Sequence, residues 1–115
     1  MVEIKKLPAV FYCTASGKEP VREWLKALDE ADRRVVGQGI ATAEFGWPVG
    51  MPVCRSLGKG LWEIRSDISH GRITRVFFCV EGEKMVLLHA FIKKTQKTPP
   101  GDLQAARTRK RDIEE

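Results

Sequence analysis

The chain is poor in the residues that build disulfide frameworks and metal sites. Its 115 residues include three cysteines and two histidines. An odd number of cysteines without a CxxC pair argues against a disulfide framework, and the scattered histidines and cysteines lack the spacing of metal ligands. Cys79 stands within an apolar run, so we expect it to be a small core residue. The sequence therefore predicts no metal and no cofactor.

The chain also lacks long hydrophobic runs, repeats and low-complexity segments. No apolar run reaches the roughly 20 residues that cross a bilayer. The apolar stretch at the N-terminus is too short for a secretory signal, and no small-residue cleavage site follows it. With 43% hydrophobic and 30% charged residues, residues 1–115 are expected to form a single globular domain. We expect a cytoplasmic protein without a membrane partner.

Positive charge is concentrated in the second half of the chain. Residues 1–54 carry seven basic and seven acidic residues, whereas residues 55–115 carry thirteen basic and eight acidic residues, which accounts for the net charge of +5. A pI near 9.3 favours an anionic partner, most commonly nucleic acid. The alternative is a solvated basic surface without a partner.

Helical periodicity in the first half predicts two consecutive helices, with a break at residues 29–31. The first follows Pro20, a residue tolerated in a first helical turn. The positions expected to face inward are Val21, Trp24, Leu25 and Leu28 in the first helix and Val35, Val36, Ile40 and Ala43 in the second. Gly37 and Gly39 either weaken the second helix by about 1 kcal/mol each or let the two helices pack closely. We expect a helical hairpin.

Three runs in the second half alternate as strands do, over residues 61–67, 72–80 and 85–93, and short turns between them indicate an antiparallel meander. The face expected to contact the helices carries Trp62, Ile64, Val76, Phe78, Val86 and Leu88. The opposite face carries Arg65, Arg75, His89, Phe91 and Lys93.

Three further features complete the expected fold. An edge strand is expected to begin at Ala9, after Pro8. Trp47, in the irregular segment 46–52, is expected to pack as a plug. A basic helix over residues 102–113 is expected to start with Asp102 as its cap. The predicted class is α+β, with a small antiparallel-dominated sheet packed on the N-terminal helical hairpin.

The basic sheet face carries residue types suited to RNA cleavage. Arginines stabilise the charge that builds up on phosphoryl oxygens when a 2′-hydroxyl attacks the neighbouring phosphate. Proton transfer needs a group that can change its charge near neutrality, and histidine is the residue type suited to this, so His89 is the obvious candidate. Phe91 offers a surface for base stacking. The ordinary alternatives are a packed histidine, a core phenylalanine, an Arg65–Glu63 surface ion pair and a solvated lysine cluster.

Several strings in the chain resemble the HigB branch of the RelE/ParE toxin superfamily. They are PVREWL (20–25), GLWEIR (60–65), GRITRVFF (71–78) and LLHAFIKKTQKTP (87–99), followed by the basic helix. The resemblance implies a RelE-like fold and a type II toxin–antitoxin toxin that cleaves messenger RNA on the ribosome without a metal. It also implies a helix-turn-helix antitoxin partner and a hetero-oligomeric complex.

The resemblance extends to individual positions. Arg75 matches the arginine that contacts the scissile phosphate, Arg65 ends the strand that lines the cleft, and Lys93 and Lys94 fall where basic catalytic residues follow the last strand. The chain departs from relatives with a tyrosine near the C-terminal helix, because its only tyrosine is Tyr12. The proton would then pass through Lys97 or His89, or the acceleration would come mainly from positioning and charge.

The candidate catalytic residues are Arg65, Arg75, Lys93, Lys97 and His89, and the candidate RNA-binding residues are Lys94, Phe91, Trp62, Lys59, Arg72 and Arg107. Two other functions remain open. One is a ParE-like toxin that inhibits gyrase by binding. The other is a phage or plasmid protein that binds nucleic acid without cutting it.

Overall fold

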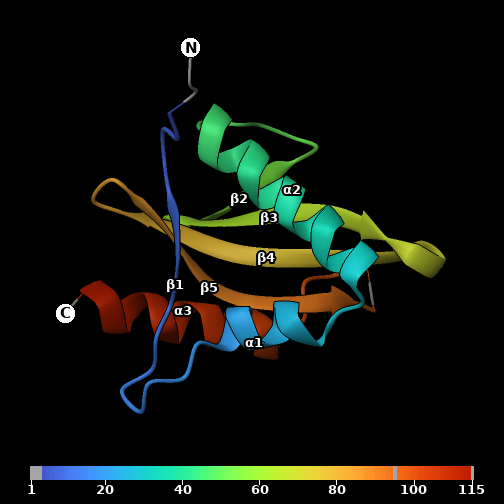
Figure 1. Cartoon of the computed structure of the whole chain (residues 1–115). Coiled ribbons are helices and arrows are strands. Elements are labelled where there is room, and N and C mark those ends of the chain that lie inside the picture. The colour runs from blue at the N-terminus through green and yellow to red at the C-terminus, as the bar shows by residue number, and fades with distance from the viewer. Residues whose placement is uncertain (1–3, 95, 115) are drawn as a thin grey trace.

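The structure, a computed structural model, describes residues 4–94 and 96–114. Its elements are β1 (Ala9–Phe11), α1 (Pro20–Ala27), α2 (Glu30–Gly46), β2 (Cys54–Gly58), β3 (Leu61–Ile68), a 3-10 turn (Ser69–Gly71), β4 (Arg72–Glu81), β5 (Lys84–Lys93) and α3 (Pro100–Glu114). The strands form one sheet in the order β1-β5-β4-β3-β2. β1 runs parallel to β5 and the other neighbours are antiparallel (Figure 1). The predicted α+β class, the meander and the strand beginning at Ala9 are confirmed.

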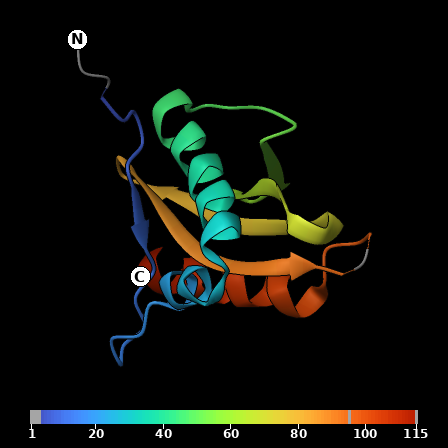
Figure 2. The ribbon, with the colours of Figure 1, turned by 45° about the vertical axis from the view of Figure 1, so that its right-hand side comes forward.

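Each face of the sheet carries its own apolar cluster. One cluster joins α1 and α2 to the sheet through residues such as Val21, Val36 and Phe78. The other lies against α3 and includes Phe77, Phe91 and Ala106. Figure 2 shows α2 crossing one side of the sheet while β5 passes in front of α3 on the other. The face that bears the predicted basic site is therefore partly covered by a helix.

A β-bulge in β5 corrects the predicted faces of Val86 and Leu88. The register pairs Phe77 with His89 but Phe78 with Leu87, so one extra residue enters β5. Strict alternation fails at such a bulge, and Leu88 and His89 both lie on the α3 side. Val86 and Leu88 therefore belong to the α3 cluster rather than beneath α1 and α2.

The predicted helical hairpin is wrong in its packing. α1 and α2 meet at a sharp turn, and α1 packs on β5 while α2 packs on β3 (Figures 1 and 2). The glycine that permits a close approach faces the sheet. A Cβ at Gly39 would lie 2.7 Å from Ser66 Oγ, whereas one at Gly37 would meet nothing within 4 Å. The apolar side chains of each helix are buried against the sheet rather than against the other helix.

The buried face of α2 differs from the prediction at Val35, which is exposed. The buried side chains recur at Asp32, Val36, Ile40 and Ala43. Adjacent helix positions point about 100° apart, so burying Val36 turns Val35 to solvent. Asp32 is buried because Ser69 and Arg72 bind its carboxylate.

The C-terminal helix begins two residues earlier than predicted, at Pro100. Asp102 is therefore inside the first turn, and its carboxylate contacts His89 instead of capping the helix. Leu103, Ala106 and Ile113 belong to the apolar cluster between this helix and the sheet. Within the described residues, no helix has the length and apolar character needed to span a membrane.

Trp47 packs as predicted, edge-on against Trp62 and Phe78 with ring centroids 5.0 and 5.5 Å away. The segment that follows it leads into β2, a strand that the sequence did not predict. β2 pairs with β3 through Arg55↔Glu63 and Cys54↔Ile64. It places an additional arginine beside the predicted basic face.

Candidate functional site

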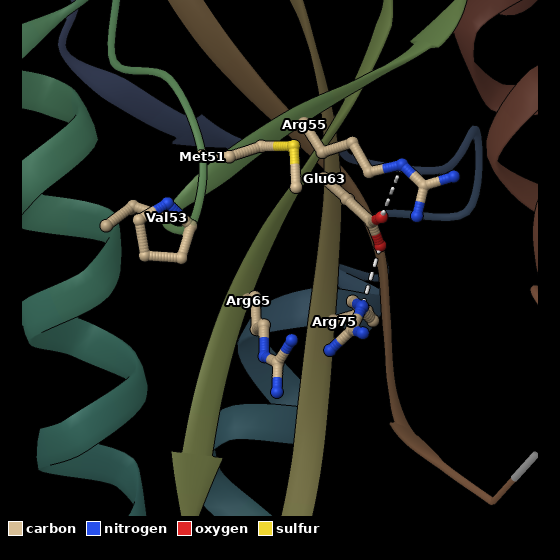
Figure 3. Close-up of a pocket in the computed structure, with 7 residues that line it drawn as sticks. Met51, Val53, Arg55, Glu63, Arg65 and Arg75 are labelled. Carbon is tan, nitrogen blue, oxygen red and sulfur yellow. Dashed lines mark ion pairs between the residues drawn. The ribbon is translucent and has the colours of Figure 1, made fainter. Parts of the chain in front are cut away.

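A small basic pocket opens on the sheet face that also carries α3. It has a volume of about 70 Å³ and is lined by Met51, Pro52, Val53, Arg55, Glu63, Arg65 and Arg75. Its charged side chains come from β2, β3 and β4, and its apolar rim comes from the segment before β2 (Figure 3). Three adjacent strands fix the positions of these charges, since hydrogen bonds hold β3 and β4 along both edges and the edge strand β2 along one.

A buried ion pair lies at the centre of this pocket. Arg75 Nε is 2.8 Å from Glu63 Oε2, and both side chains are buried. Arg55 Nε lies 3.9 Å from the other carboxylate oxygen of Glu63. Figure 3 shows Glu63 between the two guanidinium groups. One carboxylate therefore orients two arginines.

Arg65 does not pair with Glu63, which corrects the ion pair weighed from the sequence. Its Nε lies 3.7 Å from Asp67 Oδ1, at the exposed end of β3. In the sheet register Arg65 stands directly opposite Arg75. Like charges directly opposite each other destabilise a sheet, so packing gives no reason for this pair of arginines.

Electrostatic effects extend from the pocket to Lys93. Burial is the main cause that lowers the pKa of Lys93, and the positive charge of Arg75 lowers it further. Burial also lowers the pKa of Arg75, against the favourable charge of Glu63. An arginine nevertheless stays protonated in proteins. Lys93 thus gives up its proton more readily than an isolated lysine and lies within the field of the arginines.

His89 is held by α3. Its Nε2 lies 2.6 Å from Asp102 Oδ1, and Arg109 donates to its Nδ1 from 3.1 Å. Arg109 also donates to the carbonyl oxygen of Leu88. Both ring nitrogens are thus occupied by residues of α3, and the arrangement fastens this helix to β5.

The two aromatic candidates are packed against other side chains. Phe91 is buried and makes an edge contact with Phe77 at 5.2 Å between ring centroids. Trp62 is half-buried and belongs to the cluster under α1 and α2, on the face away from Arg65. The described contacts of both rings are those of packed residues.

The remaining candidates lie outside this pocket. Arg72 binds Asp32 at 2.9 Å, near the start of α2. Lys94 lines a hollow with Trp24 and Pro99, and Lys97 lies exposed in the loop before α3. Lys59 and Arg107 line a second basic pocket at the β2–β3 turn.

Sequence reasoning missed Glu63 and Arg55 as members of the site. Strand alternation places Glu63 on the same face as Arg65, so the sequence pattern contained a signal that Glu63 lies among the arginines. Arg55 gave no such signal, because β2 is short and follows a proline-rich segment. Among residues 4–94 and 96–114, no three His, Cys, Asp or Glu side chains gather as they would around a metal ion.

The arrangement suits the binding of a phosphate group. Arg55, Arg65 and Arg75 line one pocket with Glu63, and Lys93 lies close enough for these charges to affect its pKa. Glu63 holds Arg75 rigidly, and preorganised cations stabilise developing negative charge without the cost of reorganisation. A guanidinium also presents paired N–H donors that match two phosphate oxygens.

Comparison with protein families gives a match over most of the chain. Residues 23–111 match the family described as Phage derived protein Gp49-like (DUF891). The matched range includes the strands that build the pocket and most of α3. No curated protein matches the chain.

Proposed function

The chain belongs to the family of phage-derived Gp49-like proteins, and from this premise and the basic pocket we propose that it is a toxin that cleaves messenger RNA on the ribosome. The single observation that carries the proposal is the Arg65–Arg75 pair. Two arginines face each other across β3 and β4, one of them locked by buried Glu63. This arrangement opposes sheet stability and favours an anion.

The proposed reaction is an internal transfer at one phosphate. The 2′-oxygen forms a bond to phosphorus while the bond from phosphorus to the 5′-oxygen breaks, which gives a 2′,3′-cyclic phosphate and a free 5′-hydroxyl. Arg65 and Arg75 would bind the non-bridging oxygens as negative charge develops on them. The 2′-hydroxyl gives its proton to a water molecule, and the departing 5′-oxygen takes up one proton from a donor in the site, so the protons balance.

Lys93 is the group best suited to supply the proton to the leaving oxygen. Its pKa is lowered by burial and by Arg75, and a donor whose pKa lies closer to neutrality transfers its proton more readily. The carboxylate of Glu63 also lines the pocket, but Arg75 and Arg55 contact its two oxygens, so its proposed role is to orient these arginines. His89 is less suited, because Asp102 and Arg109 occupy its ring nitrogens. Lys97 remains a candidate from the sequence.

Arg65→Gln is the most informative variant. Arg65 is half-exposed and contacts a surface carboxylate, so the variant should keep its fold, whereas Arg75→Ala leaves Glu63 buried without its partner. After brief induction, primer extension on cellular messages should show new ends with wild type. Arg65→Gln and Lys93→Met should reduce them at least tenfold, the scale of general acid–base and oxyanion contributions. Lys26→Gln, on the exposed side of α1, is the matched control.

Intact messages together with Arg65→Gln as toxic as wild type would refute the proposal. Linear DNA with messages spared would indicate gyrase inhibition instead, and normal growth would indicate a protein that binds nucleic acid without cutting it. A helix-turn-helix antitoxin remains the expected partner, and a short neighbouring gene encoding one would support the toxin assignment.

A further inference from the structure

A second basic pocket lies where α3 meets the β2–β3 turn. It has a volume of about 300 Å³ and is lined by Lys59, Arg107, Lys110 and Arg111. Three of these residues belong to α3 at positions three and four apart, which place them on one side of the helix. A pocket lined by four cations is costly unless an anion occupies it.

The β2–β3 turn is shaped to receive α3. Gly58, Lys59 and Gly60 all have positive φ angles, of 88°, 53° and 77°, a conformation that glycine adopts without steric cost. A Cβ at Gly60 would lie 3.2 Å from Lys110 Cε, closer than side chains ordinarily approach. Arg107 donates to the carbonyl oxygen of Leu57 at 3.4 Å. The backbone of the turn thus fixes where the cations of α3 stand.

Few acidic side chains pair with the cations of this pocket. Lys110 pairs with Glu114 one turn further along α3. Lys59 and Arg111 are exposed, and neither forms an ion pair with an acidic residue in the described parts of the chain. Among the described residues, the four cations of this pocket therefore form one ion pair, that of Lys110 with Glu114.

The two basic pockets lie at different positions along the β2–β3 hairpin. Arg55 and Glu63 are paired in the first pocket, and Leu57 and Leu61, nearer the turn, belong to the apolar cluster on the same face of the sheet. Four residues of extended chain span at most roughly 13 Å, so the Cα of Lys59, in the turn after β2, lies within that distance of the Cα of Arg55. The two basic pockets therefore lie on one face, separated by the apolar contact of Leu57 and Leu61.

We infer that the pocket of Lys59, Arg107, Lys110 and Arg111 binds a backbone phosphate of the same single-stranded RNA whose scissile phosphate lies at Arg65 and Arg75. This inference rests on the proposed function, because that function places the RNA at Arg65 and Arg75. Basic grooves that follow a backbone in this way are typical of single-strand binding. The second contact would add affinity and fix the direction of the strand, without taking part in bond breaking.

The test measures binding separately from cleavage. A fluorescent twelve-nucleotide RNA with 2′-O-methyl groups throughout has no free 2′-hydroxyl and cannot be cut by this reaction. Lys59→Gln/Arg111→Gln is compared with Lys18→Gln/Lys26→Gln, which removes the same charge from exposed positions near α1. For each phosphate that the variant no longer neutralises, affinity at 0.1 M salt should fall roughly fivefold, and the slope of log affinity against log salt should fall by about 0.7.

Two further measurements sharpen the result. A 2′-O-methyl trinucleotide is too short to join both pockets, so Lys59→Gln/Arg111→Gln should lose less affinity for it, relative to the control, than for the twelve-nucleotide RNA. Glu114→Gln should bind the twelve-nucleotide RNA more tightly than wild type, because Lys110 loses its competing carboxylate.

Equal affinity of Lys59→Gln/Arg111→Gln and its control for the twelve-nucleotide RNA would overturn the inference. If inorganic phosphate then shifts the amide resonances of residues 58–60, the pocket takes a free anion and the strand assignment is still overturned. Failure of the proposed function looks different: wild type would leave ribosome-bound messages intact while the charge-dependent binding persists.

Discussion

Glu63 and Arg75 form a diagonal ion pair across β3 and β4, with 2.8 Å between Oε2 and Nε. In the register Glu63 stands opposite Phe77, and Arg75 stands opposite Arg65. The diagonal contact fixes Arg75 while it leaves Arg65 without a carboxylate of its own inside the pocket. The pair thus produces both the rigidity and the positive charge of the site.

Removing the carboxylate should destabilise the fold more than removing the whole pair. Glu63→Gln leaves the guanidinium of Arg75 buried without its counter-charge, and we expect a loss of about 3 kcal/mol in the free energy of unfolding. Glu63→Leu/Arg75→Met should lose less, because no uncompensated charge remains. Urea denaturation measures both. A loss below about 0.5 kcal/mol for Glu63→Gln, the scale of ordinary surface changes, would contradict the structural role of the pair.

The two glycines inside α2 should respond in opposite directions to alanine. At Gly37 an added Cβ meets nothing within 4 Å, so Gly37→Ala should stabilise the protein by about 0.5–1 kcal/mol through helix propensity. At Gly39 the Cβ would lie 2.7 Å from Ser66 Oγ and 3.4 Å from Ile64 Cγ2, so the Ser66 side chain or the helix must move, which costs stability. Thermal unfolding of the two variants provides a matched comparison. A Gly39→Ala variant as stable as Gly37→Ala would refute the close packing of α2 on β3.

The three thiols should differ in reactivity. Burial raises the pKa of Cys54 and of Cys79 to about 11, so about one part in a thousand of either would be thiolate at pH 8, the reactive form. Cys13 is exposed. A thiol reagent should therefore label one cysteine per folded chain quickly and three after denaturation. Cys13→Ser should abolish the fast label, and rapid labelling of that variant would show that the core opens.

Asp32 should make stability depend on acid pH. The backbone N–H of Ser69 is the main cause that lowers the pKa of this carboxyl, and the Ser69 hydroxyl and Arg72 act in the same direction against the effect of burial. Because the pKa is lower in the folded state, this contribution is fully present above the unfolded pKa, near 3.9. It is lost as the pH falls through the folded value.

Asp32→Asn should therefore be less stable than wild type at pH 6, and its unfolding free energy should change less between about pH 5 and pH 2. The control is Glu83→Gln, in the exposed β4–β5 turn, which should keep the wild-type pH dependence. Urea titrations across this range measure the difference. Parallel curves for Asp32→Asn and wild type would show that the Ser69 contacts do not favour the charged form.

Local sequence determined the elements whose signal is periodic. The alternation in β3, β4 and the second half of β5 placed Arg65, Arg75, His89, Phe91 and Lys93 on one face, and the structure confirms this. The charge difference between the halves of the chain likewise pointed to the basic face. These features follow from side-chain direction and composition, which short stretches of chain fix by themselves.

Only the tertiary structure decided which groups meet. The bulge in β5 depends on hydrogen-bond register with β4, and β2 becomes a strand because β3 offers it a partner. α3 covers part of the basic face. Its residues Asp102 and Arg109 contact the ring nitrogens of His89, and three of its cations line the second pocket. Glu63 on β3 forms its ion pair with Arg75 on β4, whereas Arg65 on β3 contacts Asp67. Each of these outcomes depends on contacts between distant segments, whose energies periodicity within one segment does not encode.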